Sequence, residues 1–242
     1  MKKNFLIVLL STILVLFFSI SFSQKPQYPY LSVSTIKNLF NKLAKEEERE
    51  CKLGEIRSQT GSFTSRISHE AIVSFEDYTQ CHAEGFQEIW LLRFQKEWKI
   101  YGKIMDCDNV SFEIVNIEND GRNELWMTCM NCAQGCIYRG NLVSLNLDSI
   151  DTLFSNSGHN WGMGYYEVGD CAECSSNVEF ADIDNDGILE ILETKYRTTI
   201  KSIKEDTGSF ILPENCTTSS EIIKSIYKKD EDKFKFFTAD TL

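Results

Sequence analysis

One short stretch limits the fold of this chain more than any other: Val178 to Glu193 reads V-E-F-A-D-I-D-N-D-G-I-L-E-I-L-E. Its acids occupy positions 1, 3, 5 and 9 of a loop, with glycine at position 6: Asp182, Asp184, Asp186, Glu190 and Gly187. Hard divalent cations such as calcium take several oxygen ligands, and acids at alternate loop positions turn them inward. The glycine permits a sharp turn, so the carbonyl of Ile188 can add another oxygen. Apolar residues on both sides predict that the loop joins two strands of a hairpin.

The same pattern occurs upstream, where Phe112 to Met127 reads F-E-I-V-N-I-E-N-D-G-R-N-E-L-W-M. The equivalent positions hold Asn116, Glu118, Asp120, Gly121, Arg122 and Glu124, with Arg122 at position 7, where the backbone carbonyl would be the metal ligand. Two copies in one chain indicate an internal repeat. The sequence therefore predicts two calcium-type loops, at 116–124 and 182–190.

A third, degenerate copy is expected at residues 80–88, since Glu84 to Trp90 aligns with Asp120 to Trp126. Its first and third positions hold Gln80 and His82. These side chains are poor replacements for two carboxylates, so little calcium binding is expected there.

The pattern F-x-D-x-D-x-D-G-x-x-E-I, which runs from Phe180 to Ile191, resembles the FG-GAP and VCBS repeats of secreted and cell-surface proteins. Those repeats are β-propeller-like modules that hold calcium in a hairpin loop. The resemblance implies a structure stabilised by calcium and binding at a surface, with no particular reaction. The upstream copy departs from the family pattern because it has Asn116 at position 1 and Glu118 at position 3.

An EF-hand is the alternative for Asp182 to Glu193, with Glu193 at position 12 and a helix behind it. The upstream copy argues against it, because Met127 occupies position 12 there whereas both copies keep glutamate at position 9. The run before the loop, Cys174 to Asn177, is also a poor helix former. We therefore expect a hairpin.

Residues 1–23 have the features of an export signal peptide: Lys2 and Lys3 precede an apolar run from Phe5 to Ile20, and Ser21-Phe22-Ser23 forms a small-x-small cleavage site. The run is short for a membrane span, and an uncleaved anchor is the alternative to a cleaved signal peptide. A secreted, periplasmic or cell-surface location follows, with no membrane span after cleavage.

The chain is acidic, with a formal net charge of −11, and loss of Lys2 and Lys3 with the leader would make it −13. Phosphate binding requires clustered lysine and arginine, so this balance disfavours nucleic acid and anionic membranes as partners. It is compatible with cation binding and with simple solubility.

A linker and one helix are expected over residues 24–67, with Ser32 or Ser34 as the cap and an apolar stripe at helical spacing: Val33, Ile36, Phe40, Leu43 and Ala44. A β-repeat domain is expected over residues 68–242. Its predicted hairpins are Ile89 to Ile104, Leu142 to Phe154 and Ile222 to Phe237.

Hairpins and acidic loops alternate along the chain, which amounts to about three repeats. Closed propellers typically have four to eight blades. The fold predicted is mainly β, with propeller-like hairpin repeats that are closed, incomplete or open, and with an N-terminal helix that could cover one edge.

Nine cysteines follow the leader, and disulfides are the default in an exported protein. The odd number leaves at least one thiol unpaired within a monomer. The pairs Cys129/Cys132 and Cys171/Cys174 also have the spacing of zinc ligands, but an oxidising compartment favours disulfides over free thiolates.

The sequence offers no nucleophile elbow, metalloprotease helix or phosphate-binding glycine loop beside its three histidines. The Gly-rich aromatic stretch from His159 to Tyr166 could bind sugar or protein, or it could be an ordinary loop. The function expected is a calcium-stabilised protein with a structural role or one in binding a protein or glycan. A hydrolase with structural calcium and a cysteine-based zinc or redox module remain as alternatives.

Overall fold

The computed structural model describes residues 30–47, 53–77, 86–132, 136–159, 171–203 and 216–241. The predicted signal peptide lies outside these ranges. Within them the protein is mainly β, with one helix and twelve strands: α2 (Val33–Glu46), β1 (Leu53–Gly61), β2 (Glu70–Asp77), β3 (Phe86–Gln95), β4 (Glu97–Cys107), β5 (Asn109–Val115), β6 (Glu124–Cys132), β7 (Cys136–Leu145), β8 (Ile150–His159), β9 (Cys171–Ala181), β10 (Glu190–Ile203), β11 (Cys216–Asp230) and β12 (Lys233–Thr241).

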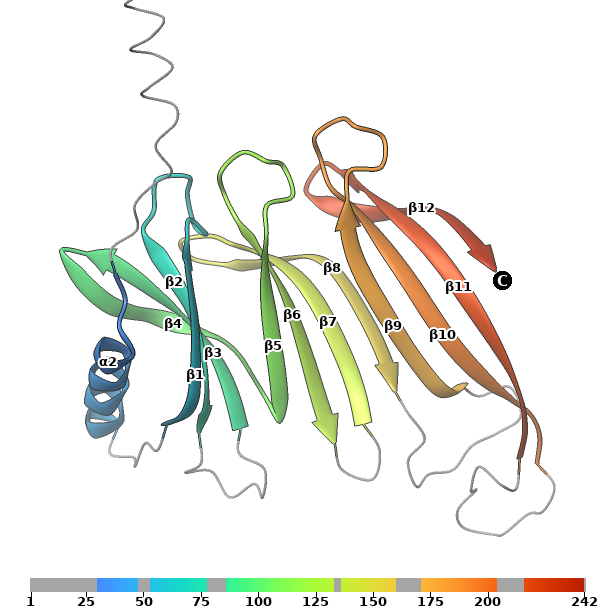
Figure 1. Ribbon diagram of the computed structural model, residues 1–242, viewed down its shortest axis with the longest axis horizontal. Helices are drawn as coiled ribbons and strands as arrows, with labels where there is room; N and C mark the ends of the chain where they lie inside the picture. The colour runs from blue at the N-terminus through green and yellow to red at the C-terminus, as the bar shows by residue number, and fades with distance from the viewer. Residues whose placement is uncertain are drawn as a thin grey trace, which may run out of the picture. The chain divides into compact units, whose positions relative to one another are not determined.

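The strands form two antiparallel sheets in chain order, β1 to β4 and β5 to β12. The larger sheet is nearly divided, because β8 and β9 share one residue pair, His159 with Cys174. The chain therefore contains three four-stranded meanders, which we call the first (β1–β4), second (β5–β8) and third (β9–β12). Figure 1 shows the connections β1–β2, β5–β6 and β9–β10 at the same end of the strands.

The three hairpins predicted from alternating apolar residues are confirmed as β3–β4, β7–β8 and β11–β12. The EF-hand alternative is wrong, because strands β9 and β10 flank the loop at 182–190. No pairing joins β12 to β1 within the described residues, so the sheets do not close into a barrel there.

The β structure begins at Leu53, earlier than the boundary expected at residue 68. Strand β1 has little apolar alternation because it is an edge strand of its sheet, and most of its side chains are exposed. The periodicity used to find strands depends on one buried face, which β1 largely lacks.

The meanders pack face to face. Alternate side chains of a strand point to opposite sides, so one meander can contribute to two cores. On β6, Leu125 and Met127 join a core shared with Ile72 and Ile89 of the first meander. Trp126, which points the other way, joins a core with Ile191, Phe234 and other residues of the third meander. The second meander is therefore buried on both faces near the acidic loops.

Helix α2 packs on the remaining face of the first meander. Ser32 is its N-cap, since the Ser32 hydroxyl accepts a hydrogen bond from Thr35 N at 3.1 Å. Phe40 is fully buried and packs edge-on against Phe75 and Trp90, with ring centroids 4.6 and 5.3 Å apart. Burying a side chain of this size contributes about 1.5–3 kcal/mol.

A disulfide between Cys107 and Cys129 joins the end of β4 to β6, and therefore links the two sheets. Cys136 and Cys174 are also disulfide-bonded. Among the described cysteines, Cys216 is a free thiol. Cys129 and Cys174, one from each pair considered as zinc ligands, are therefore not free thiolates in this structure.

Candidate metal-binding loops

The loop at 182–190, which we call the third loop, turns tightly through two residues with positive φ, Asn185 (62°) and Gly187 (88°). The carboxylate of Asp182 accepts hydrogen bonds from the amides of Asp186 and Gly187, both at 3.1 Å. Asp186 accepts the amide of Ile188 at 2.8 Å. These bonds fold the loop back on itself and hold the first acid at its centre.

Three acids of the third loop converge. One carboxylate oxygen each from Asp182, Asp184 and Glu190 lies within 4.8 Å of the others. Glu190 is buried, and its Oε2 accepts the amide of Ile183 at 2.8 Å. Asp186, also predicted as a ligand, does not belong to this group. Within the described residues, no other three His, Cys, Asp or Glu side chains bring their ligand atoms this close together.

A lysine from β11 already neutralises part of this cluster. The ammonium of Lys228 lies 2.6 Å from Asp184 Oδ2 and 3.8 Å from Glu190 Oε1. Its hydrogen bond lowers the pKa of Asp184, and the same contact raises the pKa of Lys228. A side chain of the protein thus supplies a cation to the acids of the third loop.

The second loop, 116–124, repeats this backbone. Asn119 and Gly121 have φ of 50° and 86°, which match the values at the equivalent positions of the third loop. Asp120 accepts the amide of Arg122 at 2.8 Å, and Glu124 accepts the amide of Ile117 at 3.0 Å. The hairpin loop therefore occurs at both 116–124 and 182–190.

The side chains of the second loop are arranged differently from those of the third. Glu118 is bonded to Lys229, and Asp120 pairs with Arg66 at 2.8 Å. The Arg122 side chain donates to the carbonyl of Leu145 at 3.1 Å. Basic groups draw the acids in separate directions, so the two loops share a backbone without sharing a cation cluster.

Burial affects the pKa values of two acids in the second loop, Glu124 and Asp120. Burial raises the pKa of Glu124 above its ordinary value, because its hydrogen bond to Ile117 N does not compensate for lost hydration. Burial also acts on Asp120, but the Arg122 amide and the Arg66 guanidinium outweigh it and lower the Asp120 pKa. The buried side-chain oxygen of Asn116, at position 1, has no hydrogen-bond partner in the structure.

A third copy of the loop exists that sequence reasoning missed. Residues 62–70 connect β1 and β2, and Glu70 accepts the amide of Phe63 at 2.9 Å, seven residues earlier. Glu124 and Glu190 accept the amides of Ile117 and Ile183 with the same separation. The strand registers agree too, since the residue before each loop pairs with the glutamate at position 9: Gly61 with Glu70, Val115 with Glu124, and Ala181 with Glu190.

This first loop has no acids at positions 1, 3 and 5, where it carries Ser62, Thr64 and Arg66. The fully buried Glu70 is paired with Arg93 of β3 instead, with Arg93 Nη2 to Glu70 Oε1 at 2.6 Å. Burial would raise the Glu70 pKa, but hydrogen bonds from Thr64, Ser68 and Arg93 outweigh it and lower the pKa. In the first loop, which lacks acids at positions 1, 3 and 5, the Arg93 guanidinium thus neutralises Glu70.

The degenerate copy expected at 80–88 lies mostly outside the described residues. Its ninth residue, Glu88, lies within β3 and pairs with Phe75 of β2, so it does not end a loop as Glu70, Glu124 and Glu190 do. The glutamate followed by an apolar run, Glu70 to Val73, was the sequence signal for the true third copy. The missing acids and glycine concealed it.

Backbone hydrogen bonds connect the three loops in series. The amide of Asn123 in the second loop donates to the carbonyl of Ser62 in the first, at 2.8 Å. The amide of Leu189 in the third loop donates to the carbonyl of Ile117 in the second, at 2.9 Å. Neighbouring lysines on β11 add a further link, since Lys228 contacts the third loop and Lys229 the second.

In the part of the chain that the structure describes, no helix combines the length and the apolar character needed to cross a membrane. Comparisons of this chain with protein-family models, curated proteins and solved structures gave no match.

Proposed function

We propose that this chain is an exported, calcium-binding β-repeat protein of FG-GAP/VCBS-like type, in which the third loop is the calcium site. The observation that carries the proposal is the convergence of Asp182, Asp184 and Glu190 in a tight hairpin loop. Carboxylate oxygens are the ligands that calcium prefers. Three charged acids close together also repel one another, so a divalent ion would stabilise the loop.

The donor set fits calcium, because it combines three carboxylates with a glycine-based turn at which carbonyl oxygens can approach. Calcium at this site would replace the Lys228 ammonium near Asp184 and Glu190. The second loop is proposed as a weaker site, because Lys229 and Arg66 hold Glu118 and Asp120 apart. The first loop has Arg93 in place of a metal.

A propeller-like arrangement of the three meanders is part of the proposal. Each meander has four strands, begins with the same hairpin loop and packs face to face with the next. Blades of four antiparallel strands are the unit of β-propellers. The links between successive loops would let calcium at the third loop stabilise the neighbouring meander as well.

The role proposed is structural, or in binding a protein or glycan outside the cell, and the leader at residues 1–23 supports export. The disulfide between Cys107 and Cys129 supports the same location, because disulfides persist in oxidising compartments.

Thermal unfolding of the purified protein in calcium and in chelator tests the calcium site. We expect a higher melting temperature in calcium, since a ligand that binds only the folded state stabilises it. The double substitution Asp184→Ala/Asp186→Ala should abolish this difference, while Lys228→Met should enlarge it by removing the competing ammonium.

Lys195→Met is the matched control, because Lys195 also contacts a buried acid, Glu193 at 3.3 Å, but lies outside the loops. It should leave the calcium effect unchanged. An identical melting temperature of the wild-type protein in calcium and in chelator would contradict the proposal.

A further inference from the structure

A cavity of 480 Å³ lies away from the acidic loops, on the face of the second meander that also packs against the third. Strands β5 to β9 all contribute to its wall. Binding sites for small molecules commonly enclose about 300–1,000 Å³. The cavity is thus large enough for a small molecule.

The strand register explains why this face opens into a cavity. Trp126, Leu142 and Phe154 lie opposite one another on β6, β7 and β8, and all three are buried in the core shared with the third meander. The next row is Thr128, Gly140 and Asn156, in which the central residue has no side chain. The apolar core therefore ends at this row, and the cavity begins.

Gly140 is required for the shape of the cavity wall formed by the second meander. A Cβ atom at this position would lie 2.2 Å from Asn156 Oδ1 and 2.3 Å from the Trp126 ring, so both side chains lean over the glycine. A glycine inside a strand commonly marks a close approach of another group. Here it lets an aromatic ring and an amide meet at the base of the cavity.

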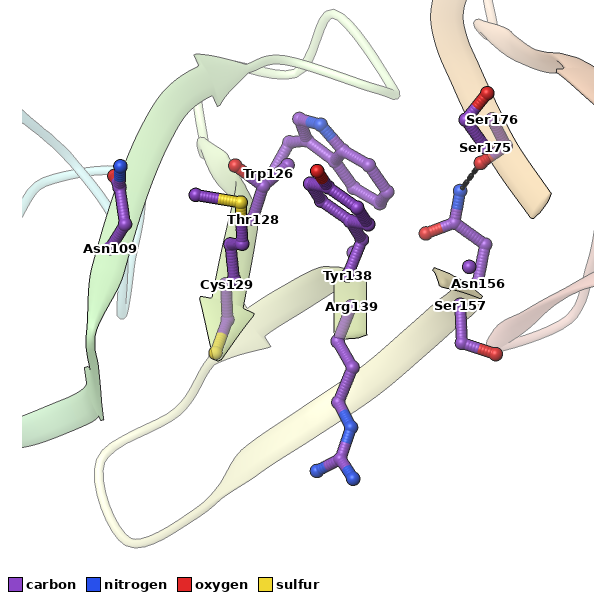
Figure 2. Close-up of a pocket in the computed structure, with 13 residues that line it drawn as sticks. Asn109, Trp126, Thr128, Cys129, Tyr138, Arg139, Asn156, Ser157, Ser175 and Ser176 are labelled. Atoms are coloured by element: carbon purple, nitrogen blue, oxygen red, sulfur yellow. Dashed lines mark hydrogen bonds between the residues drawn. The ribbon is translucent and has the colours of Figure 1, made fainter. Parts of the chain in front are cut away.

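The lining is aromatic and polar but nearly uncharged. Figure 2 shows the rings of Trp126 and Tyr138 between the Thr128 side chain on one side and Asn156 on the other. Asn156 Nδ2 donates to Ser176 Oγ of β9, which joins the two walls. Arg139 is the one charged residue among the described residues of the lining, and its guanidinium extends away from the two rings in Figure 2.

We infer that this cavity is a binding site for a neutral saccharide. Sugars present apolar C–H faces that pack on aromatic rings, and Tyr138 is 38% exposed and available for such packing. Sugars also carry hydroxyl groups that donate and accept, which matches amide and hydroxyl side chains such as Asn156 and Thr128. A charged ligand would lack a partner of opposite sign facing it in this lining, and burying an unpaired charge is costly.

Calorimetric titration of the full-length protein in calcium-containing buffer tests this site, with glucose, galactose, N-acetylglucosamine, maltose and cellobiose as probes. At least one probe should bind saturably. Asn156→Ala should weaken that binding about tenfold, which corresponds to one lost hydrogen bond. Tyr138→Ala should weaken it by a similar factor through lost ring contact.

The controls are Ser155→Ala and Ile137→Ala, which change the neighbouring residues on the opposite faces of β8 and β7. Both should retain wild-type affinity. Tyr138→Phe keeps the ring and tests the site with minimal effect on folding, so its affinity should exceed that of Tyr138→Ala. Absence of saturable binding by every probe would overturn the inference, as would binding that Asn156→Ala and Tyr138→Ala leave unchanged.

Discussion

Substitution of Arg93 by methionine tests whether a guanidinium replaces the cation in the first loop. Arg93 donates to Glu70 Oε1 from Nε at 2.9 Å and from Nη2 at 2.6 Å, and Glu70 is fully buried. Methionine keeps much of the apolar stem, so the main change is the lost charge and its hydrogen bonds. Glu70 would keep four donors, which come from Phe63, Thr64 and Ser68.

Removal of one partner from a buried ion pair costs about 3–5 kcal/mol, because the remaining charge is left without compensation. For a domain of this size, that loss lowers the melting temperature by roughly 6–20 °C. We expect the loss to be the same in calcium and in chelator, since the first loop has no acids at positions 1, 3 and 5. Adding Glu70→Gln to Arg93→Met should recover part of the stability, because the unpaired charge is then gone.

Urea denaturation followed by circular dichroism measures these free energies of unfolding. Arg57→Met is the control, since its pair with Glu55 is exposed on both sides and surface pairs contribute at most about 1 kcal/mol. A loss below about 1 kcal/mol for Arg93→Met would refute the replacement of a cation by Arg93.

Three further predictions concern the disulfide and the buried glutamates. Cys107→Ser/Cys129→Ser opens a 22-residue loop and should cost about 3.4 kcal/mol in urea denaturation; no measurable change would contradict this. Glu124→Gln should cost little at pH 7 in chelator, because burial raises the Glu124 pKa and already penalises its charged form; a loss as large as that of Glu70→Gln would contradict this. The pKa of Glu70 is lowered in the folded protein, so Glu70 contributes to folding stability above about pH 4.5, and this contribution is lost as the pH falls through the folded-state pKa. Glu70→Gln should therefore reduce the loss of stability that acid causes, as measured by unfolding curves.

The hairpins and the two acidic loops could be predicted from sequence because each has a strong local signal. Alternating apolar residues define β3–β4 and β7–β8, and Gly121 and Gly187 mark the positive φ of the loops. The first loop could not be found in the same way. Ile67 stands where the other copies have glycine, and Arg66 stands where they have aspartate.

The packing of the acids also depends on distant residues. Lys228 lies 44 residues from Asp184, Lys229 lies 111 residues from Glu118, and Arg66 lies 54 residues from Asp120. No spacing rule within a loop predicts these partners. The sequence therefore indicated which acids belong to a loop, but it could not indicate which acids converge and which are held apart by basic side chains.

Crystals of the full-length protein grown in calcium chloride would test the central claim most directly, through anomalous diffraction at the third loop. The predicted result is a calcium ion bound by Asp182, Asp184 and Glu190, with Lys228 moved away from Asp184. An ordered third loop that shows no ion, with Lys228 still bound to Asp184, would contradict it.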